Sequence, residues 1–436
     1  MRESKRINPV RWVPSLYFAM GLPFVILNMV VVLMFRGLGV GDGKIAFWTS
    51  LIMLPWTLKP LWSPFLEMYK TKKYFVVLSQ IMSGILFGLV ALSLRLPDFF
   101  AVAIGLLGLI AICGATHDIA ADGVYMSELN EVDQAKYIGW QGAFYNLAKV
   151  IATGGLVYLA GAMKEHFGVM TTWMIVMTTC AILLFALGLY NFKMIPTSQQ
   201  IKSKGGSGDA FKELSEVIGS FFSKKNIGIY ILFIILYRMA EGFVIKIVPL
   251  FLAAPVADQG LGLTEQQIGL YYGTFGAAAF ILGSFLSGYY IARFGLKKTL
   301  FPLCLIFNIP FAVYALLAIY QPSSSGVIAA AIISEYFGYG FGFVGLTLFM
   351  MQQVAAGKHQ MAHYAFATGL MNLGVMLPGM MSGYLCEWFG YQNFFIYTLF
   401  AAIPAFFMAW FIPFRNESTE KESFAEELDL EMEANR

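Results

Sequence analysis

Long apolar runs are the feature that most restricts what this chain can fold into. Twelve such runs, each bounded by charges, Pro or Gly, fall into two sets of six. A helix needs roughly 20 apolar residues to cross a bilayer, so each run is long enough for one crossing. The two sets lie at about 12–35, 45–66, 74–94, 99–126, 138–162 and 170–192, and then at about 226–254, 266–291, 299–320, 326–351, 361–386 and 391–413.

The composition agrees with this pattern. Hydrophobic residues make up 58% of the 436 residues and charged residues only 13%, whereas soluble domains contain about 25% charged residues. An ordinary soluble protein is therefore excluded. The 43 glycines suit helices that pack closely in a membrane. The sequence predicts an all-α membrane protein with twelve transmembrane helices in two six-helix bundles.

The predicted segments are a first bundle at 1–192, a linker at 193–225, a second bundle at 226–414 and an acidic tail at 415–436. The linker is basic, and its Phe211, Leu214, Ile218 and Phe221 recur at helical spacing. That spacing predicts a short amphipathic helix on the membrane surface.

Orientation follows from the distribution of basic residues. With twelve crossings both termini lie on one side, together with the basic N-terminus, the linker and the loops around Lys73 and Lys298. The loops on the opposite side carry only Arg36, Lys44, Arg95 and Lys164. Because cytoplasmic loops are enriched in Lys and Arg, both termini are predicted to be cytoplasmic.

Several kinds of chemistry are not expected. The four cysteines lack metal or redox spacing, and a metal site at His359 and His363 would lack a third ligand. The Gly340-x-Gly342-x-x-Gly345 pattern lies inside an apolar run with no strand before it, so helix packing explains it better than nucleotide binding. We expect no metal, no cofactor and no nucleic-acid partner, and no phosphate-binding loop points to an ATP-driven pump.

Ionisable residues within the apolar runs are the candidate functional residues. A charge at membrane depth costs roughly 2.5 to 3.5 kcal/mol on insertion scales, so each one needs a role. The candidates are Lys59, Glu67, Asp118, Asp122, Lys149, Arg238, Glu241, Lys246, Glu335 and His363.

Asp118 and Asp122 are the strongest candidates for proton coupling. They are four residues apart, which places both carboxylates on one face of a helix. Two carboxylates this close can hold a proton near neutral pH, as a proton-coupled carrier requires. A structural charge cluster near the helix end is the alternative. Glu335, in the corresponding run of the second set, is the reserve candidate.

Cations and aromatic rings indicate a cavity for an amphiphilic anion. Lys59, Lys149 and Arg238 offer positive charge, and Trp56, Trp140 and Tyr145 offer faces on which sugar rings can stack. Arg238 and Glu241 are three residues apart, so they could instead form a self-neutralising pair. Each aromatic residue could also serve only in helix packing.

The two halves resemble each other and a known family. Gly288-Tyr-Tyr-Ile-Ala-Arg293-Phe-Gly295-Leu-Lys297-Lys298 resembles the loop signature Gly-x-x-x-Asp-Arg-x-Gly-Arg-Arg of the major facilitator superfamily. Ala292 stands where the signature has Asp, and the first-half copy around Glu67 is more degenerate. The resemblance implies the major facilitator fold and a role for Gly288, Arg293, Gly295 and Lys297 in the conformational change.

Two further segments resemble AmpG-type muropeptide permeases. Leu54-Pro-Trp-Thr-Leu-Lys59-Pro-Leu-Trp-Ser-Pro-Phe-Leu-Glu67 is similar to that group's Leu-Pro-Tyr-x-Leu-Lys-x-Leu-Trp-x-Pro-Leu-x-Asp. Ala115-Thr-His117-Asp118-Ile-Ala-Ala-Asp122-Gly123 is similar to its Ala-Thr-Gln-Asp-Ile-Ala-x-Asp-Ala. His117 replaces the Gln of that segment, which makes it a candidate for altered substrate contact. The second half matches the group only in layout.

The resemblance implies a secondary active transporter and not an enzyme. Its implied function is proton-coupled import of anhydromuropeptides across the bacterial inner membrane for cell-wall recycling, with substrate, protons and lipid as partners, as a monomer. Import of another amphiphilic anion, a siderophore or a coenzyme A ester, is the alternative. A polytopic membrane transferase is a more distant one, since it would need a concentrated polar site and a long catalytic loop.

Overall fold

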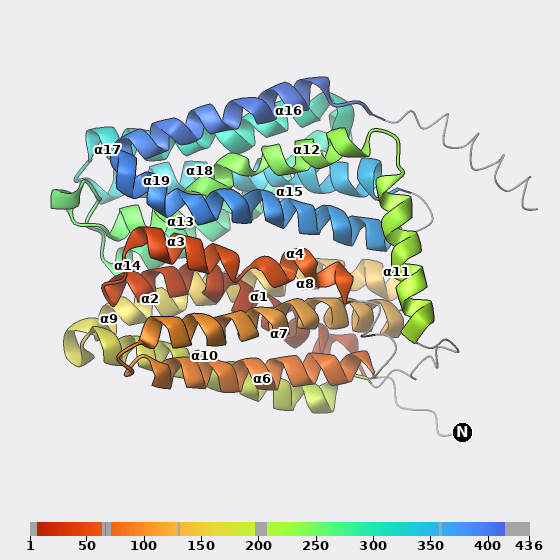
Figure 1. The fold of residues 1–436 in the computed structure, drawn as a ribbon, viewed down its shortest axis with the longest axis horizontal. Coiled ribbons are helices and arrows are strands. Elements are labelled where there is room, and N and C mark those ends of the chain that lie inside the picture. The colour runs from red at the N-terminus through yellow and green to blue at the C-terminus, as the bar shows by residue number, and fades with distance from the viewer. Residues whose placement is uncertain are drawn as a thin grey trace, which may run out of the picture.

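The structure is a computed structural model that describes residues 7–62, 66, 71–129, 131–196, 207–356 and 360–414. Almost all of these residues lie in helices, most of which run side by side along one direction (Figure 1). The predicted acidic tail, residues 197–206 of the predicted linker, Glu67 and His359 lie outside the described residues. The described part of the chain is therefore all-α.

The first half forms six crossings. Three are single helices: α6 (Lys72–Ser93), α7 (Phe99–Glu128) and α10 (Val169–Met194). The first crossing follows the short η1 (Pro9–Arg11) and is built from α1 (Val13–Val25), the π-helical turn η2 (Ile26–Val30) and α2 (Val31–Gly37). The second consists of α3 (Asp42–Leu51), α4 (Leu54–Leu58) and η3 (Lys59–Leu61), and the fifth of α8 (Glu131–Lys149), the π-helical turn η4 (Val150–Leu156) and α9 (Val157–Phe167).

The second half repeats this layout after α11 (Ser207–Phe222). Crossing seven is α12 (Ile227–Tyr237) with α13 (Met239–Ala253), and η5 (Val256–Asp258) follows it. Crossing eight is α14 (Glu265–Ile268), the π-helical turn η6 (Gly269–Phe275) and α15 (Gly276–Phe294). The last crossings are α16 (Leu296–Asn308) with η7 (Ile309–Phe311) and α17 (Ala312–Tyr320), then α18 (Ser325–Phe349) with the π-helical turn η8 (Met350–Val354), and then α19 (Gln360–Phe411).

The described residues form twelve crossings, as the sequence predicts. Nine segments of the described chain are long and apolar enough to cross a membrane. One of them, α19, holds two crossings, because Gly390 at φ 73° has a backbone conformation that separates two helices. Two more crossings are interrupted, so neither forms a single helix long enough to be counted among the nine segments. The second is interrupted between α3 and α4, and the seventh at Arg238.

The two halves meet along two seams. One is formed by α3 of the second crossing against the first part of α19, and the other by η4 and α9 of the fifth crossing against η6 and α14 of the eighth. Glycines permit the close approach: a Cβ atom at Gly43 would lie 2.8 Å from Tyr384, and one at Gly273 would lie 2.5 Å from the backbone nitrogen of Gly154. The seams thus bring backbones together at the interface of the halves.

Helix α11 runs across the ends of the crossings, on the side where the N-terminal end of the chain lies (Figure 1). Val217 and Phe221 on its apolar face are buried, and the Phe221 ring stacks on Phe366 of α19. The amphipathic helix expected on the membrane surface therefore directs this apolar face against the protein itself.

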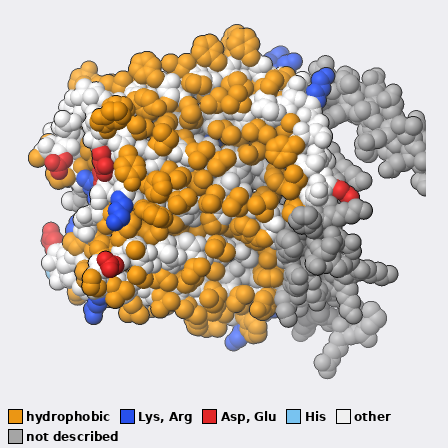
Figure 2. Space-filling model, in the orientation of Figure 1, with side chains coloured by type: hydrophobic (Ala, Val, Ile, Leu, Met, Phe, Trp, Pro, Cys, Tyr) orange, Lys and Arg blue, Asp and Glu red, His pale blue; other side chains and the backbone are white. Residues whose placement is uncertain are grey.

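The lateral surface suits a lipid environment. Figure 2 shows hydrophobic side chains covering most of the visible side of the molecule, with the charged side chains near its two ends. Large apolar residues are exposed, including Trp388 and Phe285. Because water would disfavour so large an apolar surface, the molecule is a multi-pass membrane protein.

Candidate functional site

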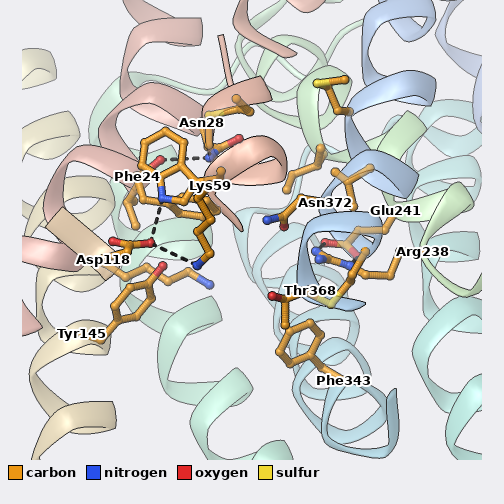
Figure 3. Close-up of a pocket in the computed structure, with 18 of the residues that line it drawn as sticks. Phe24, Asn28, Lys59, Asp118, Tyr145, Arg238, Glu241, Phe343, Thr368 and Asn372 are labelled. Carbon is orange, nitrogen blue, oxygen red and sulfur yellow. Dashed lines mark hydrogen bonds and ion pairs between the residues drawn. The ribbon is translucent and has the colours of Figure 1, made fainter. Parts of the chain in front are cut away.

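A cavity of about 920 Å³ lies between the two halves of the chain. Its walls contain nine residues for which the sequence analysis expected substrate contact or proton coupling: Trp56, Lys59, Asp118, Asp122, Tyr145, Lys149, Arg238, Glu241 and Glu335. The residues from Trp56 to Lys149 come from the first half. Arg238, Glu241 and Glu335 come from the second half. Figure 3 shows Lys59, Asp118 and Tyr145 on one side of the cavity and Arg238 and Glu241 across from them.

Asp118 is the centre of the cavity wall in the first half. Its Oδ2 accepts a hydrogen bond from Trp56 Nε1 at 2.9 Å and lies 3.8 Å from Lys59 Nζ (Figure 3). Its Oδ1 is buried and has no hydrogen-bond partner among the described residues. Gly114, one turn earlier on α7, makes room for Trp56, because a Cβ atom there would lie 2.6 Å from the indole ring. Lys59 thus contacts a carboxylate of a neighbouring helix.

Two other carboxylates each accept a hydrogen bond from a tyrosine. Tyr17 donates to Asp122 at 3.0 Å, and Tyr314 donates to Glu335 at 2.9 Å. Glu335 is buried, and both carboxylates line the cavity. Glu335 on the tenth crossing therefore faces the cavity with a tyrosine partner, as Asp122 does on the fourth crossing.

Arg238 and Glu241 form a tight pair in the second half. Arg238 Nε and Nη2 each donate to Glu241 at 2.5 Å, and the guanidinium lies 5.2 Å from the centre of the Phe343 ring. The seventh crossing is interrupted at Arg238, between α12 and α13, and Glu241 lies in the first turn of α13. A bidentate pair of this kind neutralises both charges within the membrane. Arg238 and Glu241 therefore form the self-neutralising pair that their spacing in the sequence allows.

Lys149 reaches from the first half into an aromatic cluster of the second. Its Nζ lies 4.8 Å from the ring centre of Phe280, 5.0 Å from that of Tyr336 and 5.8 Å from that of Tyr339. Ring faces attract a cation electrostatically, so three rings together stabilise an ammonium group that has left water. This contact links the two halves across the cavity.

Lys246 is a cavity residue to which the sequence analysis gave no role. It is 2% exposed, and its Nζ donates to Asn28 Oδ1 at 3.0 Å and approaches the carbonyl oxygens of Thr49 at 3.3 Å and Asn28 at 3.4 Å. The sequence made it a candidate as the single lysine in the apolar run of α13. The run did not reveal its partners, which lie more than 190 positions away.

His117 and Trp140 lie away from the cavity. The buried His117 ring has Nε2 2.8 Å from Gln80 Nε2, within a polar cluster of the first half that also includes Asn191. Trp140 is 40% exposed and stacks on Phe144. Neither is among the residues that line the cavity, so the geometry gives no support to the substrate contacts expected of them.

The loop motif of the second half lies at the end of α15. Gly295 has φ 80°, which permits the sharp turn between α15 and α16. A Cβ atom at Gly288 would meet nothing within 4 Å. Arg293 stacks over Phe294 at 5.5 Å, and Lys297 follows Gly295 at the start of α16. Within the described residues no group of His, Cys, Asp or Glu could hold a metal ion.

Polar contacts close one end of the cavity. Arg36 Nη1 pairs with Asp42 at 2.6 Å, Tyr391 donates to Asp42 at 2.9 Å, and the backbone N–H of Gly43 donates to Glu387 at 2.5 Å. Lys164 forms an ion pair with Glu265 across the other seam. The opposite end is lined by Lys72 and by Leu214 and Val217 of α11.

Comparison with known proteins places this fold and cavity in one family. The family model of the Major Facilitator Superfamily matches residues 15–372 and 242–431. AmpG 4 of Rickettsia conorii is 22% identical over 405 residues, covering 90% of this chain and 93% of that protein. The anhydromuropeptide permease of Escherichia coli K12 is 22% identical over 400 residues, covering 89% of this chain and 76% of that protein. The crystal structure of a D-xylose–proton symporter superposes with a TM-score of 0.71 at 12% identity, covering 92% of this chain and 97% of that one. The chain therefore belongs to the major facilitator superfamily and is a membrane transport protein.

Proposed function

We propose that this transport protein imports anhydromuropeptides across the bacterial inner membrane and couples the import to protons. The observation that carries the proposal is the cavity of about 920 Å³, in which charged pairs face aromatic rings from both halves. A sugar attached to a peptide has the same mixture of ring faces and charges. The similarity to the anhydromuropeptide permease of Escherichia coli over 89% of this chain supports the same cargo.

We propose substrate contact for Trp56, Lys59, Tyr145, Lys149, Arg238 and Glu241, all of which line the cavity. The aromatic side chains offer apolar faces for sugar rings, and the ionic groups offer partners for peptide charges. The pairs between Lys59 and Asp118 and between Arg238 and Glu241 match two of these cations with carboxylates.

Proton coupling is proposed for Asp118, with Asp122 and Glu335 as further carriers. Asp118 supports this role because one oxygen contacts Lys59 and Trp56 while the other has no partner among the described residues. Protonation of that second oxygen would weaken the pair with Lys59 and release the lysine toward the substrate. Proton binding and substrate binding would then use the same lysine.

Import is the direction of transport that we propose. The cavity reaches Lys72 and α11 at the end that carries the basic loops, and it is closed by polar contacts at the other end. With both termini cytoplasmic, this conformation would be open toward the cytoplasm, as after delivery of an imported substrate. We propose that a single chain carries out the cycle, because both seams and the whole cavity lie within one chain.

Uptake by proteoliposomes with an imposed pH gradient tests the function. Anhydromuropeptide, a siderophore and a coenzyme A ester are offered in turn, each with the gradient present and with it collapsed by a protonophore. We expect accumulation of the anhydromuropeptide only when the gradient is present. Accumulation of one of the other compounds instead would assign a different cargo, and accumulation that survives the protonophore would reject proton coupling.

A further inference from the structure

Lys246 differs from the other cations deep in the cavity in its partners. Lys59 and Arg238 each face a carboxylate, and Lys149 lies among three aromatic rings. Lys246 is held by neutral oxygens, from Asn28 and Thr49, and no carboxylate of the described residues lies within ion-pair distance of it. Neutral oxygens compensate a buried ammonium group only in part, so a carboxylate would stabilise it further.

The position of Lys246 suits the deepest part of a binding site. It lies two helical turns beyond Arg238, about 12 Å at 1.5 Å per residue, toward the closed end of the cavity. Asn28 and Ser50, both from the first half, line the cavity, and Ser50 directly follows Thr49. The Ser50 hydroxyl is buried and has no hydrogen-bond partner among the described residues. A charged donor without a carboxylate partner and a hydroxyl without a hydrogen-bond partner among the described residues thus both belong to the cavity wall.

We propose that Lys246, with Ser50 as a second donor, forms a subsite for a carboxylate of the cargo. One ammonium group and one hydroxyl suit a singly charged carboxylate, whereas a phosphate ester would call for more donors. This inference rests on the proposed function, because it assigns one chemical group of the proposed cargo to one residue. The carboxylate of the cargo is thus assigned to Lys246 and not to Lys59 or Arg238, because the charges of those two residues are already matched by carboxylates of the protein.

The subsite lies across the interface of the two halves. Lys246 belongs to the second half, whereas Asn28 and Thr49 belong to the first. A carboxylate that takes the ammonium group removes hydrogen bonds that join the halves at this depth. Binding of the cargo would therefore favour separation of the halves at the closed end.

Binding to the purified full-length chain tests the subsite. The probes are an anhydromuropeptide with free carboxylates and the same compound with its carboxylates converted to primary amides. We expect the wild-type chain to bind the carboxylate form at least tenfold more tightly than the amide form. In Lys246→Gln the ratio of the affinities for the carboxylate form and the amide form should fall to about one. The affinity for the amide form should stay unchanged, and this unchanged binding also shows that the variant is folded. Lys246→Arg should keep most of the preference.

Matched variants complete the experiment. Ser50→Ala should reduce the preference for the carboxylate by a smaller factor, and Lys225→Gln, which removes an exposed lysine of the chain, should leave it unchanged. A Lys246→Gln variant that retains the wild-type preference would overturn the subsite and leave the proposed function intact. If the wild-type chain binds neither form, the proposed cargo is wrong and the subsite falls with it.

Discussion

At the scale of single residues, the cavity combines charges that are matched within the protein with charges that are not. Asp118 belongs to both groups, because one of its oxygens contacts Lys59 while the other has no partner among the described residues. A carboxylate in this position can accept a proton without losing all of its contacts. The site thus favours exchange of partners over a fixed salt bridge.

Replacement of Asp118 by Asn should uncouple transport from the proton gradient. The amide keeps an acceptor for the Trp56 indole but cannot take up or release a proton. We expect gradient-driven accumulation to be abolished and counterflow exchange to be preserved, since exchange requires binding and rocking only. Both are measured in proteoliposomes, with Asp98→Asn at an exposed position as the control. If the Asp118 variant still concentrates substrate, Glu335 becomes the first candidate.

Replacement of Lys59 by Met should abolish uptake without loss of folded protein. The change removes the cation that faces Asp118 and the charge proposed for substrate contact. Asp118, left without this cation, can become protonated and so remain tolerated in the variant. Expression, size-exclusion behaviour and uptake are compared with Lys225→Met. Normal uptake by Lys59→Met would show that this lysine has no part in transport.

At the scale of helices, the two glycine seams determine how closely the halves approach. A Cβ atom at Gly273 would lie 2.5 Å from Gly154 N and 2.6 Å from Thr153 O, so the backbones must separate if the side chain is larger than hydrogen. Gly43 faces Tyr384 and Glu387 in the other seam in a similar way. The closed end therefore depends on backbone contact as well as on ion pairs.

Gly273→Ala should shift the population away from the conformation described here. In a background without the four native cysteines, we introduce cysteines at Lys164 and Glu265, which form an ion pair across the same seam. We expect cross-linking between them to fall at least threefold in Gly273→Ala. Gly228→Ala, where a Cβ atom meets nothing within 4 Å, should cross-link like the parent. Equal cross-linking of both glycine variants would mean that the seam adapts to a methyl group.

The sequence predicts the crossings well and the partners of their side chains poorly. Runs such as 170–192 match helices such as α10 because the length of a crossing is set by the bilayer. The crossings are apolar around most of their circumference, so sequence alone does not tell which face meets a neighbour. For this reason His117, one residue before Asp118, was expected in the cavity but lies with Gln80. The Lys149 and Lys246 contacts depend on how the two halves pack, which no local pattern encodes.

At the scale of the whole molecule, topology is the property most open to direct measurement. Reporter fusions after Lys73, Gly206 and Lys298 should report the cytoplasm, and fusions near Asp98 and Ser324 should report the periplasm. The reason is the enrichment of basic residues in the loops of the first group. A periplasmic signal from any of the first three sites would contradict the predicted orientation and, with it, the proposed direction of transport.

The π-helical turns have a consequence for where the molecule is easiest to deform. A π-helical turn accommodates one extra residue and interrupts the regular ladder of backbone hydrogen bonds. Two of these turns, η4 and η6, pack against each other in the seam between the fifth and eighth crossings. Backbone amides in 150–156 and 269–275 should therefore exchange with deuterium faster than those at the centre of α6 or α10, although all four lie within the membrane. The interface between the fifth and eighth crossings would then be less rigid than the centres of α6 and α10.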